Sequence, residues 1–286
     1  MKERLLPVIA IGLVITMWAS AFVGIRSALE SYSPFHLALF RYLIASTIMV
    51  VAGYLMNIRL PESKDIPAIL FIGFIGITVY HVALNYGEIT VNASAASFIV
   101  NSVPLVTAVF AILFLKERIS KYGWLGLLGG FAGVSIIVLG ESNGLSLSRG
   151  ALVLVVAAIS LAAFFVLQKP FLKKYKPLEF STYVIVAGTL FMLFLSPGLL
   201  QSIENARLEH TVSVIYLGIF PGAAGYILFA WVMNRYTATK STSFIFLIPI
   251  MTLFLSWIWL GEIPAMLSLV GGGLALGGVY FYQKVG

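Results

Sequence analysis

Residues 85–138 read NYGEITVNASAASFIVNSVPLVTAVFAILFLKERISKYGWLGLLGGFAGVSIIV, and residues 230–282 repeat the pattern as AWVMNRYTATKSTSFIFLIPIMTLFLSWIWLGEIPAMLSLVGGGLALGGVYFY. Pro104 in the first stretch aligns with Pro249 in the second. The same offset pairs Leu115 with Leu260, Glu117 with Glu262, Gly126 with Gly271 and Gly133 with Gly278. Self-similarity at a fixed spacing indicates that one structural unit occurs twice.

The chain around these stretches is strongly apolar. Of its 286 residues, 60% are hydrophobic and 10% are charged, whereas a soluble domain has about 25% charged residues. Backbone polar groups inside a bilayer must be paired internally, so the apolar segments are predicted to be helices, and they lack the alternation of a membrane barrel. Ten segments are long enough to cross the hydrocarbon core: 5–27, 34–56, 66–86, 91–114, 121–140, 149–168, 178–200, 211–233, 241–261 and 264–283.

The repeat divides these segments into two sets of five. Phe22 and Pro34 match Phe165 and Pro177, which extends the similarity to the start of each half. We therefore expect an all-α integral membrane protein with ten transmembrane helices, as one five-helix repeat over 1–145 and a second over 146–286. Because five is odd, the second repeat is inverted. Inverted repeats are typical of secondary transporters, while a duplication kept only for packing, or an inverted channel, stays open.

The basic residues indicate the orientation in the membrane. With a cytoplasmic N-terminus, most of the 18 Lys and Arg residues fall in cytoplasmic loops, and only Arg26, Arg149 and Arg207 fall outside. This excess predicts that both termini are cytoplasmic in a multi-pass protein of the cell inner membrane. Basic residues spread over short loops form no nucleic-acid-binding face. The apolar run continues beyond the Ala19–Ala21 stretch, so we interpret it as a retained helix and not as a signal peptide.

Several short motifs resemble a known family. Helix 1 contains Trp18-Ala19-Ser20-Ala21-Phe22, helix 2 contains Phe40-Arg41-Tyr42, and helix 4 is rich in Ser and Ala and ends in Phe114-Leu115-Lys116-Glu117-Arg118 before a glycine-rich helix 5. Over nearly its whole length the chain resembles the EamA-type family of the drug/metabolite transporter (DMT) superfamily. The resemblance implies export or exchange of small metabolites, often amino acids, without ATP hydrolysis. It also implies a cavity lined by helices 1, 3, 4, 6, 8 and 9, with helices 5 and 10 peripheral.

Polar residues inside the predicted helices are candidates for the substrate cavity. Ser97 and Asn101 share one face of helix 4 with Ser94, and they either bind substrate or join neighbouring helices. His81 lies beside Tyr80 and one turn before Asn85 in helix 3. An ionisable group inside a membrane helix indicates a functional site, although a neutral imidazole bonded to a neighbouring helix is the alternative.

Aromatic residues are expected at the same cavity. Their faces can hold apolar or cationic parts of a solute, although many membrane aromatics only pack or anchor at the interface. A cavity of this kind fits neutral or zwitterionic solutes better than sugar phosphates, which need paired basic residues. The candidates are Trp18, Tyr80, Phe164, Tyr226 and Phe244.

Other residues are assigned to movement or structure. Pro104 and Pro249 each remove a backbone donor inside a predicted helix, so we expect hinges there, with a static kink as the alternative. Arg41 is expected to have a structural role, either reaching outward or pairing with an acid such as Glu88. Its counterpart in the second half is Val184. Structural roles are also expected for Glu117 and Glu262, and the glycines of helices 5 and 10 predict close helix contact.

The remaining function classes find less support. The chain has no cysteine, and its three histidines lie far apart, so we predict no metal site and no cofactor. A lipid-acting membrane enzyme would need a nucleophile, a metal or an acid–base pair, and a passive channel would show rings of polar groups. No Asp or Glu falls within the middle of a predicted helix, so coupling through His81, exchange and facilitated diffusion all stay open. We expect a monomer that contacts the lipid bilayer and a small-molecule substrate.

Overall fold

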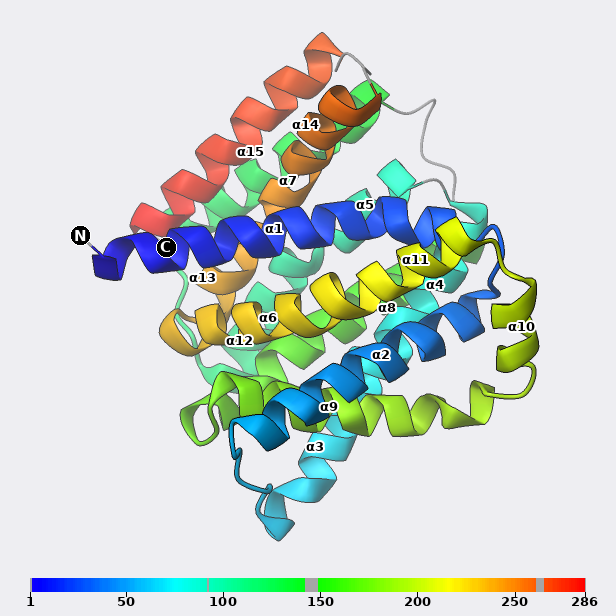
Figure 1. Ribbon diagram of the computed structural model, residues 1–286. Helices are drawn as coiled ribbons and strands as arrows, with labels where there is room; N and C mark the ends of the chain where they lie inside the picture. Colours follow the sequence, from blue (N-terminus) through cyan, green and yellow to red (C-terminus); the bar gives the residue numbers. More distant parts are fainter. Residues whose placement is uncertain (1, 92, 142–148, 261–264, 286) are drawn as a thin grey trace.

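The computed structural model describes residues 2–91, 93–141, 149–260 and 265–285, and this part of the chain is helical (Figure 1). The first half contains α1 (Lys2–Ala28), α2 (Pro34–Leu55), η1 (Ser63–Asp65), α3 (Ile66–Gly73), η2 (Phe74–Val79), α4 (Tyr80–Thr90), α5 (Ala93–Val100), α6 (Val103–Leu115) and α7 (Lys121–Glu141). The second half contains α8 (Arg149–Gln168), η3 (Phe171–Lys173), α9 (Pro177–Met192), η4 (Leu193–Leu195), α10 (Leu199–Asn205), α11 (Leu208–Leu217), η5 (Gly218–Ala224), α12 (Gly225–Arg235), α13 (Ala238–Ser243), η6 (Phe244–Leu247), α14 (Ile248–Leu260) and α15 (Met266–Val285).

Eight helical rods in the described ranges are long and apolar enough to cross a membrane. The 21-residue α7 and the 20-residue α15 occupy the fifth and tenth places. At 1.5 Å per residue, each of these two helices is about 30 Å long, which matches the hydrocarbon core. The structure therefore confirms the predicted all-α membrane fold. The eight rods are Leu5–Ala28, Pro34–Leu55, Ser63–Thr90, Ala96–Leu115, Arg149–Lys173, Pro177–Leu195, Leu208–Arg235 and Ala238–Leu255.

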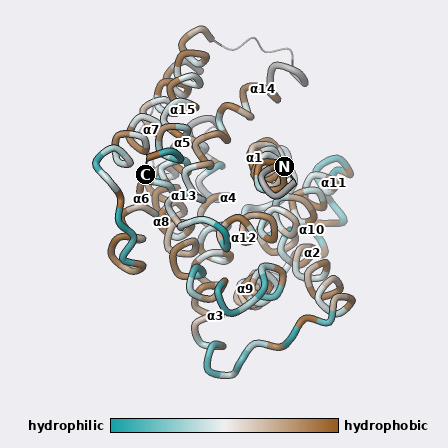
Figure 2. The backbone as a smooth tube through the Cα atoms, turned by 90° about the vertical axis from the view of Figure 1, so that its left-hand side faces the viewer, coloured by the Kyte–Doolittle hydropathy of each residue, from teal (hydrophilic) through white to brown (hydrophobic). Residues whose placement is uncertain are grey.

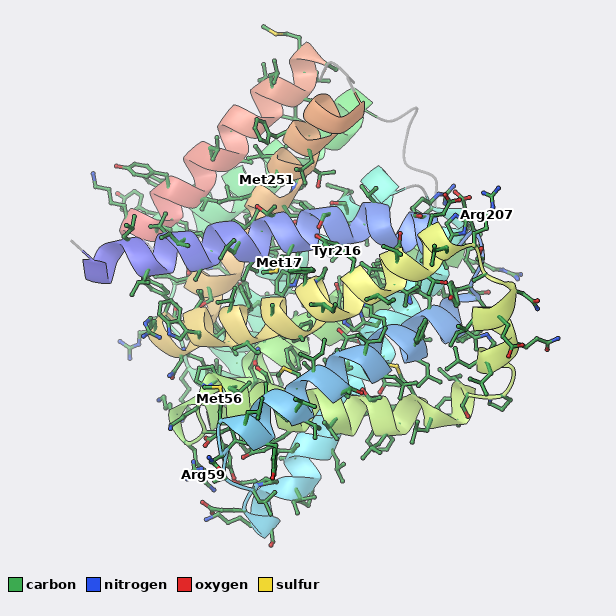
Figure 3. The ribbon with its side chains drawn as sticks, viewed as in Figure 1. Met17, Met56, Arg59, Arg207, Tyr216 and Met251 are labelled. Atoms are coloured by element: carbon green, nitrogen blue, oxygen red, sulfur yellow. The ribbon has the colours of Figure 1, made fainter. Side chains whose placement is uncertain are left out.

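Equivalent loops of the two halves lie at opposite ends of the bundle. Arg59 follows the second helix of the first half, and Arg207 precedes α11, after the second long helix of the second half. Figure 3 shows these two residues at opposite ends of the molecule. The two termini lie on the same side (Figures 1 and 2), as an even number of crossings requires, and Figure 2 shows hydrophilic colour mainly in the loops. This arrangement is the inversion that an odd number of helices per repeat produces.

The fifth and tenth helices pair through glycine. A Cβ atom added at Gly133 would lie 2.6 Å from the carbonyl oxygen of Gly271, and one at Gly278 would lie 2.3 Å from the backbone nitrogen of Gly130. The backbones of α7 and α15 are therefore in direct contact, which confirms the predicted close packing. In Figure 1 this pair forms one edge of the bundle, away from α2 and α9.

Four of the helical rods change geometry part-way along, and two of these changes lie next to the predicted hinge residues Pro104 and Pro249. The rod Ser63–Thr90 contains the π-helical segment η2, and the rod Leu208–Arg235 contains η5 at the matching place in the second repeat. The rod Ala96–Leu115 breaks between α5 and α6, and the rod Ala238–Leu255 passes through the 3₁₀ segment η6. Irregular segments of this kind are frequent at functional sites.

Candidate functional site

A narrow cavity lies between the two repeats. It is lined from the first half by α1, α2, α4 and the junction of α5 and α6, and from the second half by α8, α12, η6 and α14. Its volume is about 40 Å³, which is enough for a few water molecules. Both repeats therefore contribute to one narrow space.

Five of the predicted cavity residues line this space: Trp18, Tyr80, His81, Asn101 and Tyr226. Trp18 extends from α1 and donates from Nε1 to the carbonyl oxygen of Pro221 at 3.4 Å. Pro221 belongs to η5, and neighbouring Gly225 leaves room for the indole, because a Cβ there would lie 2.8 Å from Trp18 Nε1. A small residue and an irregular segment on one repeat thus hold an aromatic side chain of the other.

The other four predicted residues lie beside the cavity and do not line it. Phe244 borders a separate apolar space next to Trp18. Phe164 packs on Gly76 of η2, and its ring centroid lies 5.8 Å from that of Tyr226. Asn85 is buried and donates from Nδ2 to the carbonyl oxygen of Pro34 at 3.1 Å, which ties α4 to the start of α2.

Ser97 accepts hydrogen bonds from Asn101, which lies one turn further along the same helical rod. The Nδ2 atom of Asn101 donates to the carbonyl oxygen of Ser97 at 2.6 Å and to its Oγ at 3.0 Å. These two bonds use the donor side of the amide. They leave Asn101 Oδ1 buried and without a hydrogen-bond partner at the cavity wall.

His81 joins three helices. Its Nε2 atom contacts the hydroxyl groups of Tyr42 on α2 and of Tyr226 on α12, the latter at 2.9 Å. The side chain is 2% exposed, and its Nδ1 atom has no partner. The sequence reasoning missed Tyr42 as a site residue, although Tyr42 directly follows Arg41 in the quoted motif of helix 2.

Arg41 lies at the cavity, and none of the acids that the structure describes forms an ion pair with it. Its Nε atom donates to the carbonyl oxygen of Leu217 at 3.2 Å, at the point where α11 becomes η5. The side chain is 2% exposed and its Nη1 atom has no partner. In the described part of the chain the anticipated pairing with Glu88 is absent, because a main-chain carbonyl of the other repeat holds the guanidinium instead.

Glu88 is the buried acid that the sequence reasoning placed beyond its helix. The third rod extends to Thr90, four residues past the predicted end, so Glu88 lies inside the bundle. Gly87 permits this burial, because a Cβ there would lie 2.5 Å from Leu154 of α8. The sequence analysis found no acid inside a predicted helix because it ended the third helix before Glu88. That Glu88 is buried at the end of the helix was not visible from the sequence.

The two hinge candidates begin helical segments. Pro104 lies in the first turn of α6, just after the break at Asn101, and Pro249 lies at the second position of α14. A proline is well tolerated there, since the first turn has no internal donor requirement. In the second half, the backbone N–H of Ile248, directly before Pro249, donates to the carbonyl oxygen of Ile245 in η6.

Glu117 caps a helix of the opposite repeat. Its carboxylate accepts from the backbone nitrogen of Ala238 at 2.7 Å, and from the backbone nitrogen and hydroxyl of Thr239 at 3.3 and 2.8 Å. A negative charge at the start of α13 satisfies free N–H groups and the helix dipole. Its repeat partner, Glu262, lies outside the described residues.

A helical bundle built from two inverted repeats around a shared cavity is the architecture of membrane transport proteins. Residues 5–139 and 148–282 each match the EamA-like transporter family, and the chain belongs to this family. It is a multi-pass membrane transporter and not an enzyme.

Relatives of known sequence support this assignment, and a solved structure shares the fold. Over 99% of its length the chain is 42% identical to the uncharacterized transporter YdfC of Bacillus subtilis, covering 93% of that protein. It is 33% identical over 96% of its length to a protein of Streptantibioticus cattleyicolor named as a probable terminal-alkyne amino-acid exporter, covering 92% of it. One protein of known crystal structure shares the fold with a TM-score of 0.79 at 16% identity, covering 97% of this chain and 96% of that one.

Proposed function

We propose that the protein exports or exchanges amino acids or related neutral or zwitterionic solutes across the cell inner membrane by alternating access. The observation that carries this proposal is a set of buried polar atoms without partners at one cavity. Arg41 Nη1 is a charged donor and Asn101 Oδ1 is an acceptor, and both residues line the space. A buried polar atom without a partner costs free energy, so the site favours a ligand that satisfies both.

An α-amino acid supplies the complementary groups. Its carboxylate would accept from Arg41, in the charge-assisted geometry that guanidinium groups favour. Its ammonium group would donate to Asn101 Oδ1 and lie near the faces of Trp18 and Tyr80. The relative from Streptantibioticus cattleyicolor, whose name refers to amino-acid export, is consistent with this substrate class.

Alternating access is supported by the paired irregular segments. We propose that Pro104 and Pro249 act as hinges, because each stands next to a change in helical geometry at the cavity. We also propose that both termini face the cytoplasm, since the basic loops then obey the positive-inside rule. One chain contains the complete cavity, so we propose that the monomer is sufficient for transport.

Counterflow in proteoliposomes tests the function. Vesicles with purified protein are loaded with one unlabelled amino acid at a time and diluted into its radiolabelled form. We expect transient, saturable accumulation for at least one neutral amino acid, which a channel would not produce. Absence of counterflow across the complete set of neutral amino acids would disprove the proposed substrate class.

Two substitutions test the site. Asn101→Ala and His81→Ala should each lower the counterflow rate about 10-fold or more, because each removes groups at the cavity wall, where a lost bond costs about 1–3 kcal/mol. Thr47→Ala is the matched control, since Thr47 is exposed and bonds only to Leu43 of its own helix. Thermal unfolding should confirm that all variants fold. Normal transport by both cavity variants would show that the site assignment is wrong.

A further inference from the structure

Glu88 differs from the other acidic residues that the structure describes. It is 0% exposed, and both carboxylate oxygens lack a hydrogen-bond partner. By contrast, Glu179 accepts from the backbone of Lys176 and pairs with Arg59, and Glu117 caps α13. An ionised carboxylate buried without partners costs several kcal/mol, whereas its protonated form is neutral and far cheaper to bury.

The position of Glu88 connects it to the cavity. It lies one helical turn beyond Leu84, which lines the cavity, so the two residues share a face of α4. On α1, Arg26 donates from Nη1 to the backbone carbonyl oxygen of Glu88 at 3.0 Å, next to Ile25 at the cavity wall. The carboxyl group is therefore only one turn away from the space where a solute would bind.

Two arginines are the charged groups that act on Glu88. Arg26 comes from α1 and Arg41 from α2, and on α4 itself the Tyr80 hydroxyl is also influenced by the acid. Neither α5 nor η2 carries a titratable residue, and on α8 the only one is Arg149, at its exposed start. Arg41 thus belongs both to the surroundings of Glu88 and to the cavity.

We propose that Glu88 is a proton-binding site whose occupancy is linked to solute binding through Arg41. In the conformation described here Glu88 carries a proton, and Nη1 of Arg41 is free to bind the carboxylate of a solute. When the proton leaves, the carboxylate of Glu88 attracts Arg41. The linkage to solute binding rests on the proposed function, because it requires a solute with a negative group. Proton binding by Glu88 does not.

The sign of the linkage follows from charge. A solute carboxylate at Arg41 neutralises the guanidinium, which removes the positive charge that stabilises ionised Glu88. Solute binding therefore favours proton uptake by Glu88, and protonation favours solute binding to the same extent, because such coupling is reciprocal.

Infrared spectroscopy of the protein in lipid membranes tests the site without a substrate. The carbonyl band of a protonated carboxylic acid is followed during a pH titration and compared with Glu88→Gln. At about pH 7, exposed glutamates with a pKa of about 4.3 are ionised, so a remaining acid band should come from Glu88 and be absent in Glu88→Gln. Glu204→Gln is the matched control, since Glu204 is exposed on α10, and it should leave the band unchanged.

Substitution of Arg41 tests the linkage. Arg41→Gln removes the positive charge as a bound carboxylate would, so the acid band should persist to higher pH, whereas Arg41→Lys should titrate like the wild type. If Arg41→Gln does not fold, the wild-type protein titrated with and without the amino acid selected by counterflow provides the same comparison. A spectrum without a titrating band from Glu88 would overturn the proton site, and an unchanged titration in Arg41→Gln would overturn the linkage. Absence of counterflow would instead disprove the proposed function and leave the titration result intact.

Discussion

At the scale of single residues, the cavity combines satisfied and unsatisfied polar atoms. Asn101 has its donor side occupied by Ser97 and its acceptor free. Arg41 has Nε bonded to Leu217 and Nη1 free. In both cases the protein bonds one part of the side chain and so orients the free part, which is how a rigid site prepares for a ligand.

The hydroxyl of Tyr226 should in the same way hold the His81 ring in position at the cavity. Tyr226→Phe removes one hydrogen bond, worth about 0.5–1.5 kcal/mol, so we expect the half-saturation concentration in counterflow to rise about 2- to 10-fold. Tyr216→Phe is the matched control. Its hydroxyl bonds to Ser20 at 2.6 Å between α11 and α1, and neither residue is among those that line the cavity. Equal effects of the two variants on half-saturation would contradict a positioning role for Tyr226.

At the scale of elements, helix contacts depend on where glycine is needed. Gly277 and Gly278 are neighbours on α15, but a Cβ at Gly277 would meet nothing within 4 Å, whereas one at Gly278 would meet the backbone of α7. The same residue type therefore has a packing role at one position and none at the next.

This difference predicts opposite outcomes for two adjacent substitutions. Gly278→Ala should destabilise the protein by about 1–3 kcal/mol, because the backbones of α7 and α15 must separate. Gly277→Ala should be neutral or stabilise by up to about 1 kcal/mol, since alanine has the higher helix propensity. Thermal or denaturant unfolding in detergent measures both. A stable Gly278→Ala variant would show that the helix pair is less tightly packed than the structure indicates.

The cap at α13 makes a second prediction about elements. Glu117→Gln keeps the shape of the side chain but removes the negative charge at the helix start. We expect a loss of about 0.5–2 kcal/mol in unfolding free energy, in the range of helix caps and dipole interactions. Glu204→Gln, at an exposed site, should have little effect in the same unfolding experiment. This contact joins the two halves. An unchanged unfolding free energy in Glu117→Gln would therefore mean that other contacts hold the halves together.

At the scale of the whole molecule, inversion and orientation can be mapped with cysteines. The natural chain contains none, so single cysteines can be introduced at exposed positions without background. Lys64→Cys and Lys173→Cys should react with a membrane-impermeant maleimide only from the cytoplasmic side, and Gln201→Cys only from outside. The reverse pattern would contradict the proposed orientation, and labelling of Lys64→Cys and Gln201→Cys from one side would contradict the inversion.

The sequence by itself determined the membrane fold and its two repeats. Segment length and hydropathy reflect the thickness of the bilayer, and the repeated Pro-to-Glu spacing reflects a repeated structure, so both are readable without coordinates. The same reasoning found five residues of the cavity, because polar and aromatic side chains inside a membrane helix are costly unless they face other protein groups. The glycines of the fifth and tenth helices predicted close helix contact, but only the structure shows that these two helices pair with each other.

Only the tertiary structure decided which of these side chains meet. The burial of Glu88 depends on α8 packing against Gly87, and the freedom of Arg41 depends on the carbonyl of Leu217, which lies 176 residues further along the chain. The π-helical and 3₁₀ segments leave no clear mark in hydropathy, since they change backbone geometry and not composition. Contacts between distant segments depend on shape and backbone path, and a pattern of residue types along one chain does not contain that information.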